Sequence, residues 1–314
     1  GTTLDYDYLV VCAGGRFRPA LEGATTFPSG GESFRADELL DRAEDKGHRL
    51  AFIVPAGVTW SLPLYEIALM TQRRAVQRGI DVKIAIITPE SAPLAVFGPT
   101  ASAAVGELLR ARHIEIVPSS TVRELGGQGI RLSPRDRALS PAEAVALPVM
   151  EGPAIDGLPA DEQGFIPIDD HARVKGIEDV YAAGDGTNFP IKQGGLGTQQ
   201  ADAAAEHIAH RLGAGGSPEP FRPILRGKLL TGDESVHLSA HVAGGGGEGE
   251  ASSDCLWWPP HKISARYLAP LLYHGDVHEE PEPPRRSLDV EIALPREWHE
   301  RPMALDPESP PQVD

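Results

Sequence analysis

The stretch Val180-Tyr-Ala-Ala-Gly-Asp-Gly-Thr-Asn188 decides the fold of this chain. Its mainly apolar beginning, residues 179–183, predicts a short buried strand. The strand ends at Gly184-Asp185-Gly186, where glycines have no Cβ and allow the backbone to approach a ligand closely. The stretch therefore predicts a strand that carries an acidic turn to a ligand site. An ordinary strand-to-helix turn with an exposed Asp185 is the alternative.

The segment after this turn predicts a helix. Gly194, Gly195 and Gly197 precede it, and Gly213 supplies a stop. The apolar positions of one helix face are Ala201, Ala204, Ala205, Ile208, Ala209 and Leu212. The free N–H groups at the start of a helix favour negative charge, and a carboxylate accepts hydrogen bonds from hydroxyl groups. Strand, acidic turn and helix start together predict a site for a polar ligand.

The letters VYAAGD, followed by P-x-K-Q-G-G and a helix, resemble the second flavin-binding motif of the pyridine nucleotide–disulfide oxidoreductase superfamily. The resemblance implies that Asp185 holds the ribityl chain of FAD and that the helix points at the flavin pyrimidine ring. Upstream, D-Y-D-Y-L-V-V-C-A-G-G resembles the strand before the family's crossover to its nicotinamide domain, with Ala-Gly-Gly in place of the usual Ala-Thr-Gly. The cofactor-binding residues so implied are Ala13, Gly14, Gly15, Gly184, Asp185, Lys192, Gln193, Gly194 and Gly195.

The segment between these two motifs alternates strands and helices. Strands are expected at residues 50–54, 82–88 and 114–117, and helices at 34–47, 64–77 and 100–112. Such an alternation predicts a parallel, doubly wound sheet. The predicted fold class is α/β, with two interleaved doubly wound, Rossmann-like nucleotide-binding domains and a small C-terminal lobe.

The resemblance also divides the chain. Residues 1–33 are assigned to a first part of the FAD-binding domain, 34–152 to an NAD(P)-binding-like domain, 153–235 to the return segment of the FAD-binding domain, 236–278 to a C-terminal lobe, and 279–314 to an acidic, proline-rich tail that we expect to be disordered. The family's G-x-G-x-x-G unit, which binds the ADP half of FAD, has no counterpart before Tyr8, so we expect a fragment that begins in mid-domain.

The candidate dinucleotide loop, residues 55–63, is poor in glycine. It contains Gly57 alone, and Trp60 occupies its middle. Glu90 follows the next strand, where an acidic residue can meet a ribose 2′-hydroxyl, although it can equally be a solvated turn residue. Gly57 and Glu90 are therefore candidates for an NAD(P) site that the residues support only weakly.

The C-terminal lobe contains a candidate acceptor pocket at Trp257, Trp258 and Lys262. Paired tryptophans beside a lysine can stack on a flat acceptor, or they can anchor the core of a small lobe. Two histidine pairs with i,i+4 spacing, His237/His241 and His274/His278, lack the other ligands of a metal motif, and no metal site is predicted. Residues 243–253 are expected to form a mobile loop, and residues 263–273 a short apolar helix.

The net charge of −16 over 314 residues argues against nucleic acid as a partner, because phosphate binding requires clustered Lys and Arg. Two distant cysteines, Cys12 and Cys255, argue against a disulfide framework and favour the cytoplasm. Cys12 lies in an apolar strand and is predicted to be a core residue. No transmembrane segment is predicted, because prolines and Glu66 interrupt the apolar stretch 50–70.

The resemblance implies an FAD-dependent oxidoreductase of the sulfide:quinone oxidoreductase and type II NADH dehydrogenase branch. Electrons would pass from a reduced small molecule, sulfide-like or NAD(P)H, through the flavin to a quinone or similar acceptor. The alternatives are an NAD(P)H-dependent reductase of ferredoxin or disulfide type and a degenerate, non-catalytic binding module. The sequence identifies no catalytic residue, and it leaves a homodimer open.

Overall fold

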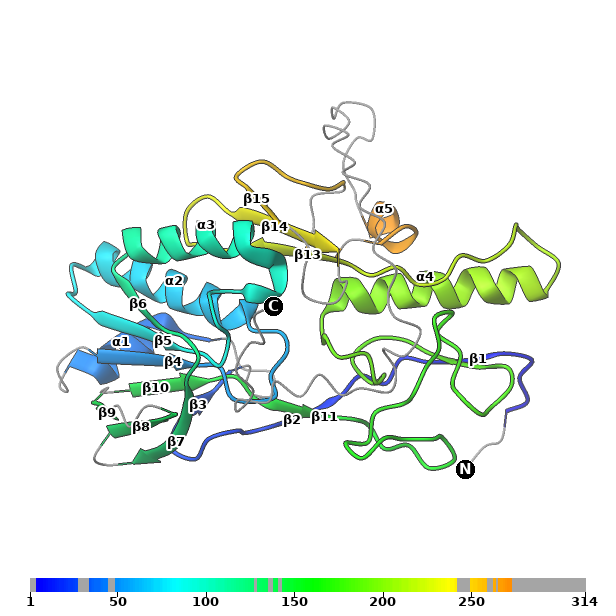
Figure 1. Ribbon diagram of the computed structural model, residues 1–314, viewed down its shortest axis with the longest axis horizontal. Helices are drawn as coiled ribbons and strands as arrows, with labels where there is room; N and C mark the ends of the chain where they lie inside the picture. The colour runs from blue at the N-terminus through cyan, green and yellow to red at the C-terminus, as the bar shows by residue number, and fades with distance from the viewer. Residues whose placement is uncertain are drawn as a thin grey trace, which may run out of the picture.

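The computed structural model of the protein describes residues 4–27, 34–44, 49–126, 129–134, 138–140, 143–241, 249–258, 262–263 and 265–272. Two lobes lie side by side (Figure 1), one built around the helices α1, α2 and α3 and the other around β1 and α4. A small sheet of three strands, β13 to β15, lies above them. The predicted α/β class is confirmed.

The first lobe is built on a parallel sheet with the strand order β3-β10-β4-β5-β6. Its strands are β3 (Thr25–Thr26), β4 (Arg49–Ile53), β5 (Lys83–Ile87), β6 (Ile114–Val117) and β10 (Glu143–Ala146). The helices are α1 (Ala36–Glu44), α2 (Leu62–Arg78) and α3 (Gly98–Ala111), with a 3₁₀ turn, η1 (Ala95–Phe97), before α3. Apolar faces of α1, α2 and α3 bury one side of the sheet in a single large core.

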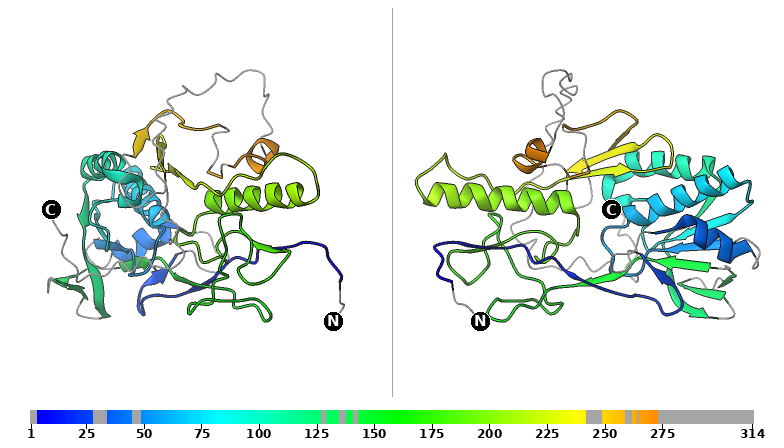
Figure 2. Two further views of the ribbon diagram at one scale, coloured as in Figure 1. Left: turned by 45° about the vertical axis from the view of Figure 1, so that its right-hand side comes forward. Right: turned by 180° about the vertical axis from the view of Figure 1, so that it is seen from behind.

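The other side of this sheet is covered by strands. These are β7 (Thr121–Gly126), β8 (Gly129–Ser133) and β9 (Ala138–Leu139), an antiparallel three-stranded sheet. Ile130 and Leu132 of β8 pack against Ile53 and Ile87 in a second core. Figure 2 shows the cyan helices and these green strands on opposite faces of the parallel sheet. The sheet is therefore buried on both sides, as a parallel sheet requires.

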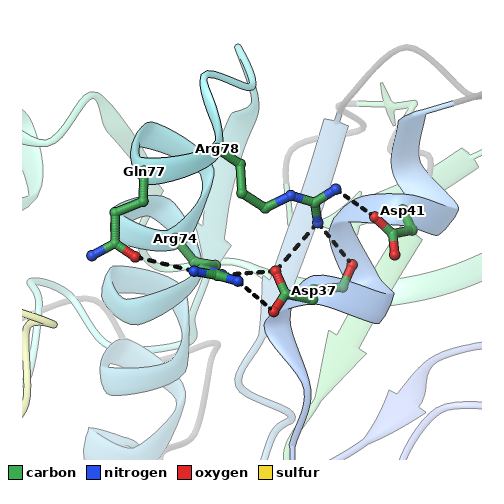
Figure 3. A network of polar contacts seen from close by, with 5 residues as sticks. All are labelled: Asp37, Asp41, Arg74, Gln77 and Arg78. Carbon is green, nitrogen blue, oxygen red and sulfur yellow. Dashed lines mark hydrogen bonds and ion pairs between the residues drawn. The ribbon is translucent and has the colours of Figure 1, made fainter.

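Two exposed arginines of α2 align α1 on its surface (Figure 3). Arg74 binds both carboxylate oxygens of Asp37, at 2.7 and 3.0 Å, and Arg78 bridges Asp37 and Asp41. Solvent screening makes such surface pairs weak, so the burial of Leu39 and Leu40 against α2 holds this helix pair together.

The second lobe joins residues far apart in the chain. β1 (Leu9–Val11) pairs in parallel with β12 (Val180–Ala182), and α4 (Gly194–Arg211) packs on β12. An antiparallel pair, β2 (Arg16–Arg18) with β11 (Val149–Glu151), connects the lobes. The strand, acidic turn and helix predicted from residues 179–212 are thus present in that order.

Cys12 corrects one expectation from the sequence. It was predicted to be buried, but it is exposed, as is Val10, which is 44% accessible. Leu9 and Val11 alternate with these residues and pack against the core that contains Tyr181. Successive side chains of a strand point to opposite faces, and this strand buries only one face.

The C-terminal region forms an antiparallel sheet of β13 (Ile224–Leu229), β14 (Val236–His241) and β15 (Glu250–Ser252), followed by α5 (Leu268–Leu272). β15 lies within the stretch 243–253 that was predicted to be a loop, and it pairs with β14. The sheet also joins the segments that we separated at residue 235. His274, His278 and the predicted tail 279–314 lie outside the described residues.

Within the described part of the chain, none of the helices combines the length and the apolar character that a membrane crossing demands.

Candidate cofactor and acceptor site

The turn after β12 contacts the turn after β1. The last hydrogen bond of the strand pair runs from the Ala183 N–H to the Val11 carbonyl oxygen at 3.1 Å. Beyond it, a Cβ built on Gly186 would lie 2.8 Å from the Gly14 carbonyl oxygen, closer than real Cβ atoms come. Gly14 and Gly184 both have positive φ angles, and no atom lies within 4 Å of their Cβ positions. The two turns therefore form a narrow backbone cradle with an open side.

Gly186→Ala tests the close approach of these turns. Because the new methyl group meets backbone, we expect a loss of about 1–3 kcal/mol in the free energy of unfolding, together with weaker flavin binding. Chemical denaturation and flavin titration measure the two effects. Gly216→Ala is the matched control, because its Cβ meets nothing within 4 Å. Equal stability of the two variants would show that the cradle is not tight.

The first turns of α4 press against the same cradle. A Cβ on Gly197 would lie 2.9 Å from the Gly184 Cα. Gln200, which is buried, accepts a hydrogen bond from the Gly184 N–H at 2.7 Å. Glycine at position 197 thus allows the helix to approach, and Gln200 fixes the acidic turn to it. Gln200 was not among the predicted site residues, and its only signal is that it is a polar residue beside the small, apolar face of the helix.

Gln193 caps the start of α4. Its side-chain oxygen accepts a hydrogen bond from the Leu196 N–H at 2.8 Å, and its amide nitrogen donates to the Arg226 carbonyl oxygen at 3.2 Å. Gly194 and Gly195 follow without side chains to cover the helix end. The first N–H groups of a helix have no partner within the helix, so this end favours an electronegative ligand atom.

Asp185 and Lys192 are both partly buried and influence each other. Burial raises the pKa of the Asp185 carboxyl, and the Lys192 charge opposes this rise. Burial also lowers the pKa of Lys192 to about 8, while Asp185 and Asp161 act to raise it. The predicted site thus contains two ionisable groups with displaced pKa values, a pattern common at functional sites.

A cleft of about 170 Å³ begins at the start of α4. Its walls come from four parts of the chain that are far apart in sequence: the first turns of α2 with the loop before it, the start of α4, β13 and the segment before α5. The lining residues are Trp60, Leu62, Pro63, Glu66, Gln193, Gly194, Gly195, Arg226, Gly227, Lys228, Lys262 and Ile263. The cleft combines apolar walls with a few charged groups, as sites for small organic molecules do.

Glu66 and Lys262 form an ion pair on the wall of this cleft. The Lys262 Nζ lies 2.5 and 2.7 Å from the two carboxylate oxygens of Glu66, and the Leu230 N–H donates to the same carboxylate at 2.9 Å. Burial raises the pKa of Glu66, and the hydrogen bond from Lys262 opposes this effect. The pair connects α2 to the C-terminal segment. Glu66 was not predicted to be a site residue. The signal in the sequence is a single acidic residue within an otherwise apolar helical stretch.

The three residues of the predicted acceptor pocket, Trp257, Trp258 and Lys262, do not line one common cleft in the described structure. Lys262 lines the cleft, whereas Trp257 and Trp258 are not among the described residues that line it. Trp257 is 4% exposed and packs edge-on against His237, with 5.2 Å between the ring centroids. Trp257 is thus an anchor of the C-terminal sheet, and Trp60 is the tryptophan of the cleft.

The two candidate dinucleotide residues lie at the carboxyl ends of β4 and β5. Gly57 has a φ of +82° and open space around its Cβ position. Glu90 is engaged by the protein: its carboxylate accepts hydrogen bonds from Ser61 at 3.0 Å, Tyr65 at 2.9 Å and Thr88 at 2.8 Å. Burial raises the pKa of Glu90, and these donors oppose the rise. Glu90 is therefore not the solvated turn residue considered above.

Of the two histidine pairs, only His237 and His241 lie in the described part of the chain. His237 and His241 lie on the strand β14, where i,i+4 residues do not converge as they do on a helix. No group of three or more His, Cys, Asp or Glu side chains gathers among the described residues in a way that could hold a metal ion.

Together, the observations describe an α/β fold in which a parallel unit is inserted between two paired strands, β1 and β12, whose following turns form a glycine-rich cradle. The family model for pyridine nucleotide-disulphide oxidoreductases matches residues 1–207, and the chain belongs to this family. FAD is the cofactor of the family, and NAD(P) involvement is typical of its reductases. A search of curated proteins finds no match to the sequence.

Solved structures of other proteins share this fold. Sulfide:quinone oxidoreductase from Aquifex aeolicus is similar with a TM-score of 0.68 and 17% identity, over 81% of this chain and 66% of that one. A ferredoxin reductase from Rhodopseudomonas palustris is similar with a TM-score of 0.54 and 17% identity, over 78% of this chain and 60% of that one. LpdA from Mycobacterium tuberculosis is similar with a TM-score of 0.51 and 15% identity, over 74% of this chain and 48% of that one. This chain thus spans about half to two thirds of the length of these structures.

Proposed function

We propose that the protein is an FAD-dependent oxidoreductase that passes electrons from a small reduced donor to a quinone or a similar flat acceptor. The observation that carries the proposal is the cleft, which starts at the glycines of α4 and ends at the Glu66–Lys262 pair. The start of α4, which packs on the cradle through Gly197, and an ionisable pair therefore border one small, largely apolar space.

The residues of the cradle fit a flavin. Gly186 and Gly197 leave no room for a Cβ on their packed sides, while Gly14 and Gly184 leave open space on the other. Asp185 is available between two glycines to accept a hydrogen bond from a ribityl hydroxyl, and the start of α4 favours the electronegative edge of the flavin ring. Bound FAD would supply the two-electron chemistry that no side chain here provides.

The cleft fits the acceptor. Trp60, Leu62 and Ile263 present apolar surface, on which a flat ring can stack or pack. The Trp60 ring is itself held by Phe97, with 5.8 Å between the centroids. Loop 55–63 is fixed near the cradle by a hydrogen bond from the Thr59 hydroxyl to the Pro190 carbonyl oxygen at 2.5 Å. A planar acceptor here would lie beside the helix start.

The Glu66–Lys262 pair can supply a proton. Reduction of a quinone to a hydroquinone takes up two electrons and two protons. The Lys262 ammonium can donate one proton to an acceptor oxygen, and Glu66, which is 7% exposed, holds that ammonium in place. The Lys262 side chain is 45% exposed, so the solvent can restore this proton and supply the second one. A positioned proton donor contributes typically 10²–10⁴-fold to a rate.

The test combines a flavin spectrum with quinone reduction. The protein is reduced anaerobically with sulfide or NADH, and re-oxidation by a short-chain quinone is followed by stopped flow. Glu66→Gln keeps the shape of the side chain but removes the partner charge of Lys262. Because the donor Lys262 remains, we expect re-oxidation to slow by less than the roughly 10²–10⁴-fold that a positioned donor contributes, with unchanged flavin content.

Glu107→Gln, on the exposed face of α3, is the matched control and should behave as the wild type. The proposal fails if the wild-type protein binds no flavin. The role of the cleft fails if Glu66→Gln re-oxidises at the wild-type rate.

A further inference from the structure

The strand β13 has one edge without a neighbouring strand. It comes first in the strand order β13-β14-β15, and it contacts both α2 and α4 (Figure 1). An edge strand presents a row of N–H and C=O groups that the sheet does not use. Because backbone groups away from water need hydrogen-bond partners, the partners of this row show where the edge is occupied and where it is open.

One side chain identifies which residues of β13 present these groups. Gln199 of α4 accepts a hydrogen bond from the Ile224 N–H and donates one to the Ile224 carbonyl oxygen, both at 2.9 Å. In an antiparallel pair, residues that bond across to the partner strand alternate with residues whose N–H and C=O point away from it. Ile224 points away from β14, and Arg226 and Lys228, two and four residues further along the same register, therefore do so as well.

The positions on either side of Lys228 along this edge are occupied. The Gln193 amide donates to the Arg226 carbonyl oxygen at 3.2 Å, and the Glu66 carboxylate accepts from the Leu230 N–H at 2.9 Å. Between them lie the N–H and the C=O of Lys228, and among the described residues no group outside the sheet bonds to either. An opening one residue long thus remains between two occupied positions.

This opening borders the cleft described above. The two side chains that occupy its ends line the cleft, and so do Gly227 and Lys228. The strand is held close to the core, because a Cβ on Gly227 would lie 2.5 Å from the Phe97 side chain and 2.7 Å from that of Leu62. A main-chain donor and a main-chain acceptor therefore lie side by side at a fixed place in the cleft wall.

We propose that the main chain of Lys228 anchors the electron acceptor in the cleft. Its N–H donates a hydrogen bond to a carbonyl oxygen of the oxidised acceptor, and its C=O accepts one from the hydroxyl group that reduction creates. This pair of groups selects a quinone or another conjugated carbonyl compound over an aromatic acceptor without such an oxygen.

Lys228 is a positioning residue in this arrangement. The two electrons come from the flavin, and the two protons come from Lys262 and the solvent, so the Lys228 main chain supplies neither. The inference rests on the proposed function, since it takes the cleft as the acceptor site.

Amide hydrogen exchange, measured by NMR, tests the opening directly. In the ligand-free protein the Lys228 N–H should exchange at least about tenfold faster than the Gly227 N–H, which bonds across to β14. The probe is a naphthoquinone with methyl groups on both free quinone carbons, so that cysteine thiols do not add to it. At saturation and without an electron donor, it should slow exchange of the Lys228 N–H by about tenfold. The corresponding dimethylnaphthalene, which lacks the oxygens, should slow it by less than about twofold.

Two substitutions separate the N–H of Lys228 from its side chain. Lys228→Pro removes the charge and the N–H, whereas Lys228→Gln removes the charge alone. Proline is tolerated in an edge strand where its missing N–H does not belong to the ladder. Lys228→Pro should bind the naphthoquinone about two- to tenfold more weakly than Lys228→Gln, which is the contribution of one hydrogen bond. Both variants should bind the dimethylnaphthalene equally.

The inference is overturned if the Lys228 N–H exchanges as slowly as the Gly227 N–H in the ligand-free protein, or if saturating naphthoquinone leaves its exchange unchanged. Equal affinity of Lys228→Pro and Lys228→Gln for the naphthoquinone would overturn it as well. Should Lys228→Pro not fold, the exchange measurement on the wild type decides. None of these measurements requires electron transfer, so a protein that passes no electrons to a quinone would refute the proposed function and still show whether Lys228 binds a carbonyl oxygen.

Discussion

Replacement of Asp185 by alanine is expected to weaken flavin binding about ten- to a hundredfold. Asp185 lies between Gly184 and Gly186 in the sequence, and in the proposed function its carboxylate accepts a charge-assisted hydrogen bond from a ribityl hydroxyl. Such a bond contributes about 1.5–3 kcal/mol, and each 1.4 kcal/mol corresponds to about a factor of ten in affinity. Asp185→Asn retains one acceptor and should lose less. Fluorescence titration of the cofactor-free protein with FAD gives the dissociation constants.

A purely structural role for Asp185 gives a different result. If the side chain only shapes the turn, both variants should lower the melting temperature of the cofactor-free protein and leave flavin affinity almost unchanged. Asp156→Ala, at an exposed aspartate of another turn, controls for the loss of a surface charge and should change neither quantity. Constant affinity with reduced stability would remove Asp185 from the list of cofactor ligands.

NADH is expected to reduce the bound flavin slowly, at less than about 1 s⁻¹ at saturation, the lower end of ordinary turnover rates. A dinucleotide needs residues without Cβ where its pyrophosphate meets the backbone, and loop 55–63 offers Gly57 alone. Glu90, the residue placed to meet a ribose hydroxyl, already accepts three hydrogen bonds from Ser61, Tyr65 and Thr88. To bind a ribose there, the protein would have to give up one of them.

Stopped-flow absorbance at the flavin band measures this rate under anaerobic conditions. Dithionite is the control reductant, because complete bleaching by dithionite shows that the bound flavin can be reduced. Sulfide in place of NADH tests the other donor class. Complete reduction by NADH within milliseconds would mean that loop 55–63 binds the dinucleotide through contacts other than a glycine-rich turn.

The α/β fold was predictable because its signals are local. The apolar strands and periodic helices of residues 49–117 appear within one or two residues of the expected bounds, and Gly79 ends α2 in the left-handed conformation that helix stops favour. Features that depend on distant partners were missed. The sequence before Glu250–Ser252 is rich in glycine and favours a loop. Only the pairing of these three residues with β14 reveals the strand.

The site was predictable in part, for the same reason. The glycines and Asp185 follow one another in a single stretch, so the acidic turn could be predicted from the residues, and its flavin role from the family resemblance. The Glu66–Lys262 pair joins residues from α2 and the C-terminal segment, and no local pattern links them. Trp257 and Trp258 drew attention as adjacent aromatic residues, but Trp60 was the one whose loop folds onto the cleft.

The pairing of Leu9 with Val180 also constrains the order in which the chain folds. Closing so long a loop in an open chain is entropically costly, and no local contact offsets that cost. The strands that pair in the five-stranded sheet are closer together in sequence than Leu9 and Val180 are. The pairing of β2 with β11 then brings together the two chain segments that lead into and out of this sheet. Residues 12–15 then separate β1 from β2, and residues 152–179 separate β11 from β12. We therefore expect the cradle to assemble after the inserted sheet, so that its formation would report a folded sheet.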